Sequence, residues 1–192
     1  MSRRALAALL GCLAACAPNA LPSESRRDPI SERFVVEPWP ATPPWKRTSD
    51  RHTRQGASSR WAPEGAAPDA PGDSLWKEIR FGAQQAEASD FARDELARLA
   101  KDCPGAKVGG PHAGTEDGND VAYGEVSCSR PALVLVKVIR GHEAQYLAER
   151  TFQDPPGAQA LRAANAFMSE RVYLCPIYAA TGRCATRVDE EN

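Results

Sequence analysis

The chain has 192 residues, of which 26% are charged and 42% are hydrophobic, values that are ordinary for a soluble globular protein. Its formal net charge is −1, with 24 basic and 25 acidic residues. This balance gives no overall reason to expect a nucleic acid as a partner.

The first fifteen residues have the features of a secretory signal. Arg3 and Arg4 form a short positive region, and an apolar run follows over residues 5–15. The run is too short to cross a membrane as a helix, which needs about 20 apolar residues. We therefore exclude residues 1–15 from the prediction of the fold.

The end of this run, Leu13-Ala14-Ala15-Cys16, resembles the lipobox of bacterial lipoproteins. In that class a peptidase cuts before the cysteine, which carries a lipid and becomes the new N-terminus. The resemblance implies a membrane anchor at Cys16. Because Ala17 and not Asp follows, it also implies the periplasmic side of the outer membrane. Two alternatives are an ordinary signal peptide cut near Ala17 and a buried apolar N-terminal helix.

Export would change how the remaining cysteines are interpreted. Cys12 would leave with the signal, so the mature chain would keep Cys103, Cys128, Cys175 and Cys184 besides the anchor. Four cysteines in an oxidising compartment predict two disulfides, with three possible connectivities. The chain has no CxxC pair, and the spacings do not resemble a zinc motif, so no metal or other cofactor is predicted.

A proline-rich stretch over residues 16–74 is predicted to be an extended linker. Ten of the sixteen prolines lie here, and the stretch has no sustained period of 2 or 3.6. Proline removes a backbone donor and blocks helix formation. A flexible chain of this length would span about 40 Å, which would hold a domain well away from the membrane.

Two islands in the linker carry aromatic residues that disordered segments usually lack. The candidate partner-binding residues are Phe34, Val36, Trp39, Trp45 and Trp61. The second island is also basic, with five Lys or Arg residues and one Asp over residues 46–60. Three interpretations are open: packing on the chain's own domain, binding of a partner protein, and contact with anionic lipid or cell-wall polymer.

The folded domain is predicted over residues 75–192. An amphipathic helix should end before Pro104, because apolar residues recur at helical spacing at Ala88, Ala92, Leu96, Leu99 and Cys103. A glycine-rich loop is expected to follow through Asp120. A period of 2 then predicts strands over residues 121–128, 132–140 and 143–152.

The pair Gly141-His142 predicts a two-residue type II′ hairpin between the last two of these strands. In that register Arg140 faces Glu143 and Val138 faces Gln145. One face of the sheet then gathers apolar residues that the helix would cover, namely Ala122, Val126, Cys128, Val134, Val136, Val138 and Leu147. A half-covered solvent face is expected on the other side, with Tyr123, Lys137, Tyr146 and Arg150.

The helix should bring Cys103 next to Cys128, which leaves Cys175 to pair with Cys184. A second helix is predicted after Asp154-Pro155-Pro156, followed by a short strand at residues 172–174. The expected fold class is α+β: a small antiparallel sheet of three or four strands packed with two helices and held by two disulfides.

No catalytic residues are predicted. His112, in the expected loop, is the only histidine in a position typical of catalysis, and Asp117-Gly118-Asn119-Asp120 lacks the order of an EF-hand calcium loop. Glu125 and Glu149 should lie on opposite faces of the sheet. We expect a non-enzymatic envelope lipoprotein that binds an envelope protein or the cell wall. One alternative is a hydrolase of peptidoglycan or a related polymer that uses His112 and acidic residues of the loop over residues 109–120, and another is a small-ligand or metal-binding module.

Overall fold

The computed structural model describes residues 32–39, 44–66, 72–83, 86–176 and 184. Within these ranges the protein is mostly β, with a seven-stranded antiparallel sheet, a two-stranded sheet and two helices. The strands of the large sheet follow one another, from edge to edge, in the order β2 (Trp45–Thr53), β3 (Gly56–Pro63), β4 (Ser74–Phe81), β8 (Ala144–Phe152), β7 (Leu133–Arg140), β6 (Asn119–Ser127) and β5 (Lys107–Glu116).

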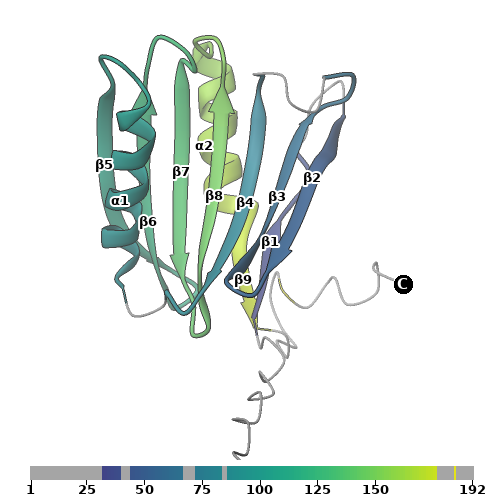
Figure 1. Cartoon of the computed structure of the whole chain (residues 1–192), viewed down its shortest axis with the longest axis vertical. Helices are drawn as coiled ribbons and strands as arrows, with labels where there is room; N and C mark the ends of the chain where they lie inside the picture. The colour runs from purple at the N-terminus through teal and green to yellow at the C-terminus, as the bar shows by residue number, and fades with distance from the viewer. Residues whose placement is uncertain (1–31, 40–43, 67–71, 84–85, 177–183, 185–192) are drawn as a thin grey trace, which may run out of the picture.

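The remaining elements cover the two faces of this sheet. Helix α1 (Ala88–Lys101) packs on β5, β6 and β7 on one face, which we call the α1 face (Figure 1). Helix α2 (Ala158–Glu170) and the antiparallel pair β1 (Glu32–Val36) and β9 (Val172–Pro176) cover the opposite face. Alternate residues of β6 and β7 therefore enter two separate apolar cores.

The expectation of a small sheet of three or four strands is wrong. The large sheet takes β2 and β3 from the proline-rich stretch, and β5 from the segment expected to be a glycine-rich loop. Neither β2 nor β5 shows the regular alternation of apolar and polar residues by which a strand is recognised in a sequence. The edge strand β2 is mostly exposed and so shows no apolar alternation, while a bulge between Gly109 and His112 interrupts the period of β5.

Several elements agree with the sequence prediction. The first helix, the three strands β6 to β8, the second helix and the short last strand all lie near their predicted positions. The apolar residues expected under the first helix form one core with Ala88, Ala92 and Leu96. Both predicted cysteine pairs are present: the Cα atoms of Cys103 and Cys128 are 6.0 Å apart, and those of Cys175 and Cys184 are 5.5 Å apart.

The predicted hairpin register between β7 and β8 is wrong by two residues. Arg140 pairs with Gln145, and Val138 with Leu147. The turn is longer than expected, and a residue outside the hairpin binds it. The carboxylate of Glu32 in β1 accepts hydrogen bonds from the backbone N–H groups of His142, at 2.8 Å, and Glu143, at 3.3 Å. A shift of two positions keeps every side chain on its predicted face.

The prediction of a half-covered second face is also wrong. Lys137 and Tyr146 are fully buried and Arg150 is 2% exposed, because α2 and the β1–β9 pair lie over them. Within the described residues, no helix combines the length and the apolar character that crossing a membrane requires.

Candidate functional site

The residues predicted to bind a partner are brought together, with Phe34 buried and the other four partly buried against the same core. Phe34 is 3% exposed, and its ring centroid lies 5.3 Å from that of Tyr146. This part of the chain therefore packs on its own domain, the first of the three interpretations above. The predicted anchor, Cys16, lies outside the described residues.

The other four predicted residues, Val36, Trp39, Trp45 and Trp61, line one small cavity of about 150 Å³. Two of the rings that form its wall stack on the buried guanidinium of Arg150. The centre of this group lies 4.8 Å from the ring of Trp39 and 4.6 Å from that of Trp45. Stacking of an arginine on aromatic rings is stabilising, so these rings have a structural role. A partner-binding role for them stays a prediction.

A larger and open groove, of about 590 Å³, lies on the α1 face over β2, β3 and β4. It is open because α1 packs on β5 to β7 and does not extend over these strands. Side chains that point to one face of the three strands line it, namely Arg51, Thr53, Ser58, Trp76, Glu78 and Arg80. We call this the β2–β4 groove.

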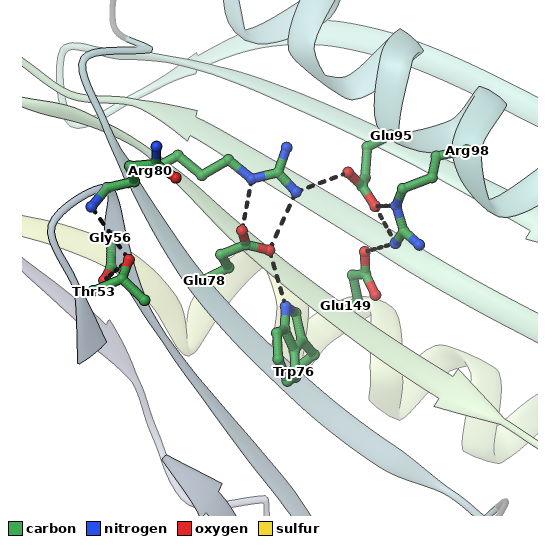
Figure 2. A network of polar contacts seen from close by, with 9 residues as sticks. Thr53, Gly56, Trp76, Glu78, Arg80, Glu95, Arg98 and Glu149 are labelled. Carbon is green, nitrogen blue, oxygen red and sulfur yellow. Dashed lines mark hydrogen bonds and ion pairs between the residues drawn. The ribbon is translucent and has the colours of Figure 1, made fainter. Parts of the chain in front are cut away.

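A network of alternating acidic and arginine side chains connects the groove to α1 (Figure 2). Glu78 accepts hydrogen bonds from Trp76 Nε1, at 3.2 Å, and from Arg80 Nε, at 2.7 Å. Arg80 also donates to the buried Glu95 of α1, at 3.2 Å. Trp76, Glu78 and Arg80 therefore hold one another in fixed positions along β4.

The network of side chains continues behind the groove, from α1 to β8. Arg98 donates to Glu95 and, at 3.2 Å, to Glu149 of β8. Burial, and then the charge of Glu95, raise the pKa of Glu149 to about 8. The pKa of Glu95 is lowered: burial opposes this, but hydrogen bonds from Arg98 and Glu149 and the charges of Arg98 and Arg80 outweigh it. At neutral pH, Glu149 is therefore protonated and Glu95 is ionised.

Sequence reasoning missed this pair. It compared Glu149 with Glu125 and expected them not to share a site, and the structure agrees, because Glu125 is exposed on the opposite face. The partner of Glu149 is Glu95, which lies in a helix. The available signal was the i,i+3 spacing of Glu95 and Arg98, with Glu95 next to the apolar residue Leu96 of the buried side of the helix.

His112 lies at a second open groove, of about 550 Å³, between β5, β6 and α2. Tyr123, Glu125 and Ser169 line the same groove. Within the described part of the chain, His112 forms no hydrogen bond or ion pair with them, and the hydroxyl of Tyr123 donates to Glu116. Among the described residues, His112 is thus not bonded to a nucleophile of the kind that acyl transfer uses.

Lys137 next to this groove has a structural role. Its ammonium group is fully buried and donates to Glu116, at 2.6 Å, and to the backbone carbonyls of Met168, at 2.9 Å, and Val172, at 2.7 Å. The three bonds match the three donors of an ammonium group and join the end of α2 to the sheet.

The described ranges contain no group of three or more His, Cys, Asp or Glu residues placed to hold a metal ion. Two open grooves lie on the described surface, and an ionic network holds the side chains of one of them. Comparison of the chain with protein-family models, curated proteins and solved structures found no match.

Proposed function

We propose that the protein is a lipid-anchored binding module of the bacterial cell envelope, on the periplasmic side of the outer membrane. The observation that carries the proposal is the use of its cysteines. The four cysteines of the folded part lie in two pairs at disulfide distance, and a fifth, Cys16, ends a signal-like segment. Stable disulfides form in oxidising compartments, which an exported chain reaches.

A binding role, and not a catalytic one, is supported by how the polar side chains are used. The buried acids and arginines near the β2–β4 groove are bonded to one another, which fixes the surface. Binding sites on rigid elements with satisfied supporting bonds are well defined. The proposed partner is an envelope protein or the cell wall. The alternative, a hydrolase of an envelope polymer, depends on His112 and has less support, because His112 is bonded to no nucleophile among the described residues.

Substitution of one cysteine tests the anchor. Cys16→Ser removes the thiol that would be acylated, so we expect the variant to incorporate no labelled fatty acid and to leave the membrane fraction. Cys12→Ser is the matched control, because Cys12 lies within the apolar signal run and not at its end. The measurements are fatty-acid labelling and membrane fractionation of cells that produce the full chain. Equal labelling and retention of both variants would contradict the proposal.

A further inference from the structure

The β2–β4 groove has one flat apolar surface among polar groups. Trp76 is half-buried, and its indole is held by the hydrogen bond from Nε1 to Glu78. The hydroxyl-bearing residues Ser58, on the neighbouring strand β3, and Thr53, on the edge strand β2, line the same groove. Figure 2 shows Trp76 beside Glu78 on one strand and Thr53 on another. An indole face in a groove that also holds polar side chains suits a ring that is apolar on its face and polar at its edge.

The charge of the groove is positive on the side away from α1. The carboxylate of Glu78 is engaged by Arg80, which also pairs with Glu95, so these charges largely cancel. Arg51, in contrast, is exposed and forms no ion pair within the described residues. Its guanidinium lines the groove at the edge strand β2, where it is not matched by a carboxylate of the described residues. This part of the groove therefore attracts an anion.

We propose that the β2–β4 groove binds an acidic oligosaccharide, with a sugar ring on Trp76 and a carboxylate on Arg51. The volume of about 590 Å³ is in the range of small-ligand sites and suits a few sugar units. The inference rests on the proposed function, since it names the ligand class of the envelope module. Guanidinium and carboxylate form strong charge-assisted hydrogen bonds, which gives selectivity for an acidic over a neutral sugar.

The test uses the purified full chain, with an α-1,4-linked tetragalacturonate as the probe and its neutral methyl ester as the comparison. We expect calorimetry to show about tenfold tighter binding of the acid, because one charged hydrogen-bonded contact has about this effect. Arg51→Glu should weaken binding of the acid by about tenfold or more. Arg162→Glu, the same change at an exposed position on α2, should alter it by less than about twofold.

Tryptophan fluorescence gives a second measurement of binding, at the proposed sugar-binding residue. The ligand-dependent change in tryptophan emission should be present in the wild type and absent in Trp76→Phe, with near-ultraviolet circular dichroism to check that the variant is folded. The proposal is overturned if acid and ester bind equally, if neither binds, or if Arg51→Glu and Arg162→Glu weaken binding equally. These measurements are made in solution, so a failure of lipid anchoring at Cys16 would leave them unaffected, and the two proposals fail separately.

Discussion

Glu149 and Glu95 show how two acids are accommodated in the interior of this sheet. The side chain of Glu95 is 3% exposed and meets both Arg80 and Arg98, whereas the side chain of Glu149, 11% exposed, meets Arg98 alone. The acid with two cationic neighbours keeps the negative charge, and the other keeps the proton. The pair therefore buries one net carboxylate instead of two, which avoids a large desolvation penalty.

The proton on Glu149 makes the stability of the fold depend on pH. The ordinary pKa of this carboxyl is 4.5 and its pKa in the folded protein is about 8. As the pH rises from about 4.5 to about 8, the unfolded chain releases this proton while the folded chain retains it, so the free energy of unfolding falls. In Glu149→Gln this contribution is absent. We expect the variant to gain roughly 1–3 kcal/mol relative to the wild type between pH 5 and pH 8.

Urea unfolding at both pH values measures this difference. Glu64→Gln is the control, because Glu64 is an exposed acid in a surface ion pair with Lys46, and its removal should change the pH dependence little. A parallel pH dependence of wild type and Glu149→Gln would show that Glu149 ionises normally in the folded protein.

At the scale of elements, β1 connects parts of the chain that are distant in sequence. Glu32 accepts hydrogen bonds from the turn between β7 and β8 and, at 3.0 Å, from the hydroxyl of Tyr146. Burial and then Glu32 raise the pKa of that hydroxyl, so it remains a donor. A side chain on Gly141 would place its Cβ 2.3 Å from the Glu32 carboxylate, which explains the glycine at this position.

Replacing this carboxylate should loosen both elements. Glu32→Ala leaves two backbone donors and a buried hydroxyl without their acceptor, so we expect a loss of about 2–4 kcal/mol in the free energy of unfolding. Hydrogen exchange at the amides of His142 and Glu143 should become faster. Glu125→Ala, at an exposed position of β6, is the control and should change neither quantity. Unchanged exchange at the turn would show that Glu32 does not close it.

The elements that were predicted correctly differ physically from those that were missed. Strands β6 to β8 lie in the centre of the sheet between two covered faces, so apolar residues such as Val126 and Val138 mark them clearly. Strand β2 lies at an edge, with Arg51 and Thr53 exposed, and its place depends on pairing with β3. The alternation of apolar and polar residues along a strand reflects burial of one face, so an exposed strand does not show it.

The candidate site shows the same limit. The sequence singled out four of the residues that line the cavity of about 150 Å³, namely Val36, Trp39, Trp45 and Trp61, because aromatic residues are unexpected in a linker. It did not indicate the β2–β4 groove, whose walls come from three strands that meet only in the folded sheet. The Glu95–Glu149 pair joins a helix to β8, 54 residues apart in the numbering, and no spacing rule connects them.

At the scale of the whole molecule, the cores extend beyond the predicted domain of residues 75–192. Phe34, Trp45 and Trp61 pack in the core on the α2 face together with Tyr146 and Leu75. Without residues 1–74, the predicted domain would expose the apolar core on the α2 face. It would also expose the edge of β9 that pairs with β1 and the edge of β4 that pairs with β3.

We therefore expect the fragment of residues 75–192 to lack a cooperative unfolding transition that the full chain has. Removal of three strands and several aromatic side chains costs more than the 5–15 kcal/mol by which domains are usually stable. Urea titration followed by near-ultraviolet circular dichroism measures this, with both proteins oxidised. A fragment that unfolds in one sharp transition would contradict the extended core.

The position of β4 beside β8 sets an order on the assembly of the protein. Strands β2, β3 and β4 follow one another in the chain, yet the inner edge of β4 has no neighbour until β8, which ends at Phe152, has been made. Until then β4 presents a row of free backbone donors and acceptors to any other nascent chain. A chaperone that holds the growing polypeptide until its C-terminal third emerges would protect this edge from self-association.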